Sequence, residues 1–169
     1  MNLNSSTNAW LKKINMQLNW IFKKFDELTA AELYSIMQLR NEVFVVEQNC
    51  VYQDADDKDQ ASMHLCGWDG ANLVAYTRII PQGISYTEAS IGRVVTDPAA
   101  RGQGLGHTLM SQAIDTLQRL WGLQPIRIGA QAHLQDFYRQ HGFVTASPVY
   151  DEDGIDHVEM RRDPAGASV

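Results

Sequence analysis

The amino-acid sequence predicts one domain of the α/β (α+β) class, in which a mixed sheet carries helices on its faces. Its 169 residues suffice for one hydrophobic core and are too few for two comfortable ones. Segments with strand-like character are interleaved with segments in which apolar residues recur at helical spacing. No segment repeats, so the order of the elements defines the fold.

The composition restricts the classes of partner. A formal net charge of −6 argues against nucleic acid, because the phosphate backbone repels an acidic surface. No apolar run approaches the roughly 20 residues that span a bilayer. The polar amino terminus also lacks the apolar core of a signal peptide. We therefore expect a cytoplasmic protein, a monomer or homodimer, that binds neither nucleic acid nor membrane.

The residue types that hold metals are not arranged for that purpose. Cys50 and Cys66 have no metal-like spacing, and in a reducing compartment two thiols are more often ordinary buried cysteines than a disulfide. The acidic run that begins at Asp54 is no complete calcium loop, because Lys58 takes a ligand position and glycine is absent. No metal site is predicted.

The first third of the chain predicts a strand followed by a helix. Residues 1–15 are Asn- and Ser-rich and are expected to be a disordered extension, with the domain over 16–163 and a frayed tail over 164–169. A strand is expected over 18–25. Thr29 and Glu32 have the form of a capping box that opens a helix. One face of that helix carries the apolar residues Leu33, Ile36, Met37, Val43 and Phe44, together with Arg40.

The middle and end of the chain supply the remaining elements. A hairpin over 63–68 and 71–80 turns at Asp69-Gly70, and a further strand covers 89–97. A long helix is expected from Leu105 to Trp121, with a stop at Gly122. After it we expect, in order, a strand over 125–133, a helix over 134–141, and two strands over 142–149 and 156–162 separated by a turn over 150–154.

Three glycines alternate just before the long helix, in "ARGQGLGHT". A helix start offers unpaired amides and a partial positive charge, and glycines allow an anion to approach the backbone. Neither a Walker loop nor a dinucleotide fingerprint fits, because no Gly-Lys follows and the residue three after Gly104 is His107. The spacing therefore indicates an anion site, with a plain flexible turn as the rival interpretation.

Two linked motifs resemble those of the GNAT N-acetyltransferase family. Arg101, Gly104 and Gly106 occupy the positions of its Arg/Gln-x-x-Gly-x-Gly/Ala acyl-CoA loop. Downstream, Phe137-Tyr138 and Gly142-Phe143 match its second segment. The stretches "LRNEVFVVEQNCVYQDADDKD", "IGRV", "GAQAHLQDFY" and "VYDEDGIDHVEM" resemble the ElaA subfamily, so the likeness runs from about residue 16 to residue 162.

The resemblance implies a mostly antiparallel sheet whose central strands splay into a cleft for acetyl-CoA. Main-chain groups of Val94, Val95 and Thr96 would bind the pantetheine arm. The pyrophosphate would be held by amides of the glycine loop, namely Arg101, Gly102, Gln103, Gly104, Leu105 and Gly106. Tyr138 would lie near the cofactor sulfur.

The chemistry of acyl transfer to an amine asks for a proton donor and a proton acceptor. A phenol with a pKa of about 10 is protonated at neutral pH, so Tyr138 is the candidate general acid, with a core packing role as the alternative. The base is open. The family often places a carboxylate on the strand before the loop, where this chain has Arg93 and only Glu88 at the edge. His64 and then His133 are candidates, and a water chain or an already neutral amine would need neither.

The acceptor side is specified less well. Arg40, Glu47 and Arg93 are candidate substrate-binding residues, although Arg40 and Glu47 could instead form a buried ion pair. The acidic loop over 51–62 is interpreted as a solvated surface, with attraction of a cationic amine as the alternative. We expect an acetyl-CoA-dependent N-acyltransferase with an unidentified amine acceptor. The alternatives are an acyl-CoA-binding regulator that does not turn over and transfer to a non-amine acceptor.

Overall fold

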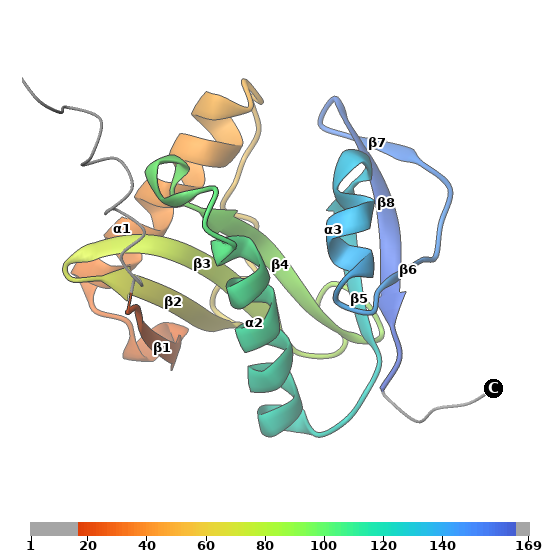
Figure 1. Ribbon diagram of the computed structural model, residues 1–169, viewed down its shortest axis with the longest axis horizontal. Coiled ribbons are helices and arrows are strands. Elements are labelled where there is room, and N and C mark those ends of the chain that lie inside the picture. Colours follow the sequence, from red (N-terminus) through yellow and green to blue (C-terminus); the bar gives the residue numbers. More distant parts are fainter. Residues whose placement is uncertain (1–16, 165–169) are drawn as a thin grey trace, which may run out of the picture.

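The computed structural model describes residues 17–164, which form an eight-stranded mixed sheet with helices on both faces (Figure 1). The strands follow the order β1-β2-β3-β4-β5-β8-β6, and β7 pairs with β8. Only β4 and β5 are parallel, so the predicted mostly antiparallel sheet is confirmed. The strands are β1 (Asn19–Lys24), β2 (Met63–Asp69), β3 (Asn72–Ile80), β4 (Ala89–Thr96), β5 (Ile126–Gln131), β6 (Val144–Thr145), β7 (Tyr150–Glu152) and β8 (Ile155–Arg162).

The described residues include no helix that is long and apolar enough to cross a membrane. The expected extension over 1–15 lies outside the described residues, as does the tail from 165 onward.

The helices pack on opposite faces of the sheet. Those with α-helical geometry are α1 (Ala30–Arg40), α2 (Leu105–Trp121) and α3 (Gln135–Arg139). On β2, Leu65 belongs to the core under α2 whereas the next residue, Cys66, belongs to the core under α1. This follows because successive side chains of a strand point to opposite faces. The short α3 adds Tyr138 to the core that α2 covers.

The start of α1 confirms its prediction and its end does not. The Thr29 hydroxyl accepts a hydrogen bond from the Glu32 amide, and the Glu32 carboxylate accepts one from the Thr29 amide. After Arg40, however, the chain widens into a π-helical segment, η2 (Asn41–Glu47). A π-helix bonds i to i+5 and so has more residues in each turn. Val43 and Phe44 nevertheless pack in the core cluster of Ile36, as predicted, whereas Glu47 at the end of the segment pairs with Arg101 and not with Arg40.

The central strands β4 and β5 pair at one end only. Their ladder consists of Ala89 with Ile126 and Ser90 with Arg127, and beyond these residues the strands diverge (Figure 1). The predicted splaying is confirmed. Main-chain groups of β4 that point toward β5 beyond Ser90 are therefore left without a strand partner.

A bulge bends β4 where the divergence begins. Tyr76 of β3 faces Val95 while Arg78 faces Gly92, so two residues of β4 oppose Thr77. One of them, Arg93, has a φ of 53°, a left-handed conformation that is rare for residues other than glycine. The Thr77 hydroxyl donates to the Gly92 carbonyl at 2.9 Å. Bulges increase local bend and twist, so this one turns β4 away from β5.

The carboxyl-terminal hairpin differs from its prediction. The expected turn over 150–154 is mostly strand β7, and only Asp153 and Gly154 make the turn, with φ of 55° and 82°. Two successive left-handed residues form the type of hairpin turn whose twist matches the flanking strands. The strand expected over 142–149 is reduced to β6.

Candidate active site

A cleft of about 410 Å³ occupies the space between the diverging strands. Its size is within the range of about 300–1,000 Å³ that is usual for small-molecule sites. One wall consists of β4 from Ile91 to Thr96 and the end of η2, and the other of β5, α3 and the β7–β8 hairpin.

Side chains reach this cleft from both faces of the sheet. Tyr138 enters from the face covered by α2 and α3. Ala130 and Val158 point to that same face, so their strand neighbours Gln131 and His157, which also line the cleft, point to the opposite face. The cleft is thus a passage through the sheet rather than a hollow on one side.

The residues that the resemblance assigns to pantetheine binding lie on the wall of the cleft. Val94, Val95 and Thr96 all line the cleft, on the part of β4 that has no pairing with β5. A strand edge of this kind offers donors and acceptors to an extended ligand, as a further strand would.

The glycine loop connects β4 to α2 by way of the short turn η3 (Pro98–Ala100). Gly102 and Gly104 have φ of 81° and 75°, and a Cβ built on either would meet no atom within 4 Å. Gly104 is the N-cap of α2 and brings no side chain to the amides of the first turn. Gly106 has a different role, because a Cβ there would lie 3.5 Å from Phe137.

The remaining loop residues point in different directions. Arg101 lines the cleft, and its Nη1 donates to Glu47 Oε1 at 2.8 Å, which links the loop to the end of η2. Leu105 is buried in the core under α2, and Gln103 lines a separate depression beside α1. Only the amides of these two residues could therefore serve an anion at the loop.

Tyr138 combines packing with access to the cleft. Its ring makes edge contacts with Phe137 and Phe143, and its exposed fraction is 7%. Its hydroxyl takes no hydrogen-bond partner among residues 17–164. Burial raises the pKa of Tyr138 to about 12, so the phenol keeps its proton at neutral pH.

His64 is not placed to be a base, and that prediction is wrong. Its ring is 1% exposed and does not line the cleft. Both nitrogens are used, because Nε2 contacts the Asp59 carbonyl at 3.0 Å and Nδ1 contacts the Tyr76 hydroxyl at 2.8 Å. Burial lowers the pKa of His64, which favours a neutral, structural ring.

The other two candidate bases also differ from each other in position. Glu88 precedes β4 at the end where the strands pair, and it forms an ion pair with Arg127 at 2.9 Å. It does not line the cleft. His133 does line it, as an exposed residue after β5.

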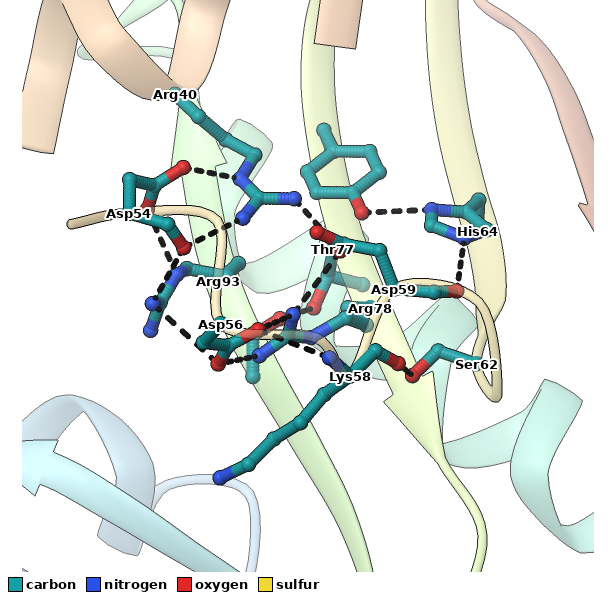
Figure 2. A network of polar contacts seen from close by, with 12 residues as sticks. Arg40, Asp54, Asp56, Lys58, Asp59, Ser62, His64, Thr77, Arg78 and Arg93 are labelled. Atoms are coloured by element: carbon teal, nitrogen blue, oxygen red, sulfur yellow. Dashed lines mark hydrogen bonds and ion pairs between the residues drawn. The ribbon is translucent and has the colours of Figure 1, made fainter. Parts of the chain in front are cut away.

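A buried ionic network lies under the bulge of β4 (Figure 2). Arginines from α1, β3 and β4 meet acids of the loop over 51–62. Arg40, with no exposed surface, donates from Nε to Asp54 at 2.8 Å and from Nη1 to Asp59 at 2.7 Å. Arg78 contacts Asp56 and Asp59.

Two sequence-based interpretations are therefore corrected. Arg40 does not pair with Glu47, because the π-helical segment moves Glu47 off its face, and its complete burial leaves no surface for an acceptor. The acidic loop is not a solvated surface, since Asp54 and Asp59 are both buried. The three arginines neutralise charges that water would otherwise have to solvate.

The network also holds the bulge itself. Arg93 Nε donates to Asp54 Oδ1 at 2.8 Å, and its Nη2 donates to the Asp54 carbonyl at 3.0 Å. Tyr52 donates its phenol proton to the same carboxylate at 2.8 Å. Tyr52 and Arg93 both line the cleft, so one carboxylate connects its wall to the buried network.

The pKa values reflect this arrangement. Burial opposes ionisation of Asp56 and Asp59, but hydrogen bonds and the charges of Arg78 and Arg40 outweigh it and hold both pKa values below the usual range. Burial raises the pKa of the Tyr52 phenol, and its bond to Asp54 acts in the same direction.

Sequence reasoning missed three residues that line the cleft: Tyr52, Gln131 and His157. Gln131 Nε2 donates to Gln48 Oε1 at 3.0 Å across the cleft. The sequence held a signal for Tyr52. The predicted helix and strands carry more arginines than nearby acids, so the acidic partners had to come from the loop that contains Tyr52.

The fold and the site together define the class of protein. It is a single α+β domain with a splayed sheet, a glycine-capped helix start and a cleft that passes through the sheet. Such a cleft is suited to holding two substrates for group transfer. Residues 27–164 match the family model described as "Acetyltransferase (GNAT) domain". The chain is 43% identical over 148 residues to Protein ElaA of Escherichia coli (strain K12), covering 86% of this chain and 97% of that one.

Solved structures agree with this match. The crystal structure of Escherichia coli ElaA gives a TM-score of 0.81 at 42% identity, covering 86% of this chain and 99% of that one. An acyl-CoA N-acyltransferase from Pseudomonas aeruginosa gives 0.82 at 48% identity with the same coverage. An aminoglycoside 6′-N-acetyltransferase complexed with coenzyme A shares the fold, with a TM-score of 0.63 at 16% identity over 84% of this chain and 96% of that one. The chain belongs to the GNAT acetyltransferase family, and is thus an acyltransferase of the acyl-CoA-dependent type.

Proposed function

We propose that the protein moves an acetyl group from acetyl-CoA to an amine of a small molecule or peptide, by direct attack of the amine on the thioester. The through-sheet cleft is the observation that carries the proposal, because groups from opposite faces line one space. A donor and an acceptor could approach each other there with no covalent enzyme intermediate. Holding two reactants in an attack geometry can account for about 7–11 kcal/mol of a barrier.

The donor half of the cleft fits a coenzyme A thioester. The open space in front of Gly102 and Gly104 would admit a pyrophosphate to the amides at the start of α2. The unpaired edge of β4 over Val94–Thr96 suits the amide-bearing pantetheine arm. When bound, acyl-CoA supplies an activated acyl group. The related P. aeruginosa structure, described as an acyl-CoA N-acyltransferase, supports this assignment.

Tyr138 is the proposed proton donor to the departing sulfur. Its raised pKa keeps the hydroxyl protonated, and no other described residue takes that proton in a hydrogen bond. The acceptor half carries the acidic side chains Glu152 and Asp153, whereas the charge of Glu47 is offset by Arg101. The charge of Glu152 and Asp153 favours a cationic amine over an anionic acceptor.

The test is release of free thiol from acetyl-, propionyl- and succinyl-CoA with a broad panel of amines and peptides, alongside a direct measurement of CoA binding. We expect turnover with acetyl-CoA and at least one amine. Tyr138→Phe should lower kcat by about 10²-fold or more and leave CoA binding nearly intact. Binding of CoA without thiol release for any acceptor would refute the proposal and favour a non-catalytic regulator.

A further inference from the structure

His157 is the one histidine that is both partly buried and a lining residue of the cleft among residues 17–164. It lies on β8, where Gln131 of β5 and Tyr150 of β7 are its direct cross-strand neighbours. Its ring stacks on that of Tyr150, with 6.1 Å between the centroids. These contacts fix the ring on the face of the sheet opposite Tyr138.

A hydrogen bond also fixes which nitrogen of this ring carries the proton. Nδ1 lies 2.8 Å from the carbonyl oxygen of Ile155. A carbonyl can only accept, so Nδ1 must be the donor, and in a neutral ring Nε2 then has a free lone pair. No described residue donates a hydrogen bond to that Nε2 atom.

The other histidines lack this combination. Both nitrogens of His64 are occupied in the buried network. His107 and His141 bond each other at 3.0 Å beside Phe137, outside the cleft lining. His133 lines the cleft, but it is exposed and no hydrogen bond with residues 17–164 fixes its tautomer.

We infer that His157 is the general base of the reaction, with Nε2 as the atom that accepts a proton from the acceptor amine. The inference rests on the proposed function. In the balanced reaction an ammonium acceptor gives one proton to Nε2 and becomes nucleophilic. The nitrogen–carbon bond then forms, the carbon–sulfur bond breaks, and sulfur gains a proton from Tyr138. The nitrogen then loses its second proton, which returns to the Tyr138 oxygen. His157 releases to water the proton that it accepted from the ammonium group.

Charged and titratable groups surround His157 on several elements. The carboxylates of Glu152 and Asp153 line the same cleft. Several other charged or titratable groups face this region from β5, β8, η2 and the loops. Most are paired: Glu159 with Arg127, Glu47 with Arg101, and Arg93 and Tyr52 with Asp54. The others are Cys50, His133, Tyr150 and Tyr86, whose hydroxyl lies beside that of Tyr150 at Gly129.

The first test needs no turnover. Long-range proton–nitrogen NMR spectra of the histidine rings, recorded on the full chain at neutral pH, identify His157 by the signals that vanish in His157→Asn. We expect the tautomer with the proton on Nδ1. A ring with its proton on Nε2 would have no lone pair for the amine and would overturn the inference.

The second test is kinetic and uses the same variant. Asparagine places an amide nitrogen near the position of Nδ1, so it can keep the bond to Ile155, but it has no atom at Nε2. His157→Asn should lower kcat/KM for an amine by about 10²–10⁴-fold and remove the acidic limb of its pH profile. CoA affinity should stay within about twofold, and added imidazole should restore part of the rate. Asp156→Asn, at an exposed position of β8 next to His157, is the matched control and should behave as wild type.

The outcomes separate the two proposals. An active wild type whose rate and pH profile survive His157→Asn defeats the inference alone. The inference alone is also defeated if His133→Asn, and not His157→Asn, removes the acidic limb of the pH profile. It is likewise defeated if His157→Asn loses CoA binding together with activity. A wild type that acetylates no amine defeats the proposed function, and the inference with it.

Discussion

Replacing Asp54 by asparagine tests how far the buried network supports the fold. This carboxylate accepts three hydrogen bonds at 2.8 Å, from Arg40, Arg93 and Tyr52. Three arginines and three aspartates meet in the network, so removing one negative charge leaves an uncompensated positive charge beside a fully buried Arg40. Breaking a buried ion pair in this way costs about 3–5 kcal/mol.

The expected change in thermal midpoint follows from that free energy. For a chain of this size 1 kcal/mol corresponds to about 2–4 °C, so Asp54→Asn should lower the Tm by roughly 6–20 °C. Calorimetry or circular dichroism at pH 7 would measure it. Asp136→Asn, which removes one partner of an exposed pair with Arg139, should lower the Tm by less than about 2 °C.

A double variant shows whether charge balance is the cause. Adding Arg93→Gln to Asp54→Asn restores neutrality, so the double variant should be more stable than the sum of the single changes by more than about 0.5 kcal/mol. An Asp54→Asn protein that melts within 2 °C of the Asp136→Asn control would refute the reasoning. If the effects of the two single changes on the free energy of unfolding simply add, the loss of stability comes from packing and not from charge.

Three further expectations concern pH, the glycine loop and the cleft. Burial lowers the pKa of His64, so below pH about 6.5 the unfolded state binds more protons than the folded state. Urea titrations should therefore show that the free energy of unfolding decreases as the pH is lowered from about 6.5. Asp56 and Asp59 have lowered pKa values, so their contribution is present above pH about 4 and should be lost as the pH falls further. Gly104→Ala places an alanine at a φ of 75°, so it should destabilise the fold by about 1 kcal/mol. Calorimetry should show CoA binding weakened about tenfold. An unchanged affinity would exclude the glycine loop from the CoA site. Gln131→Ala removes the bond to the opposite wall and should raise the KM of the amine while the Tm stays within about 2 °C.

Local features of the fold could be predicted because they depend on residues close together in the sequence. The capping box of α1, the length of α2 and the hairpin between β2 and β3 each involve contacts within a few positions, although the turn lies at Gly70 and Ala71, one residue later than expected. The glycine pattern likewise predicted a loop before α2, where Gly102 and Gly104 adopt the left-handed conformation that glycine takes at low cost.

Departures from regular helix and strand geometry were harder to predict than the elements themselves. Val43 and Phe44 pack in the core cluster of Ile36 as expected, but the π-helical segment after Arg40, which separates Glu47 from Arg40, was not predicted. The bulge at Arg93 had no signature in "SIGRVV", because a residue that is not glycine adopts its conformation there under tertiary constraint.

The sequence by itself determined the order of elements, the helix start that could receive an anion and the presence of a tyrosine in the third helix. Only the tertiary structure decided that Arg40 would meet Asp54 and Asp59, that His64 would be enclosed, and that His157 would face the cleft. Ion-pair partners come from distant segments, and the face that a strand residue takes depends on register and bulges. These are set when the sheet assembles, so the short-range pattern predicted the glycine loop and the helix that follows it, while the lining of the cleft could be identified only in the folded chain.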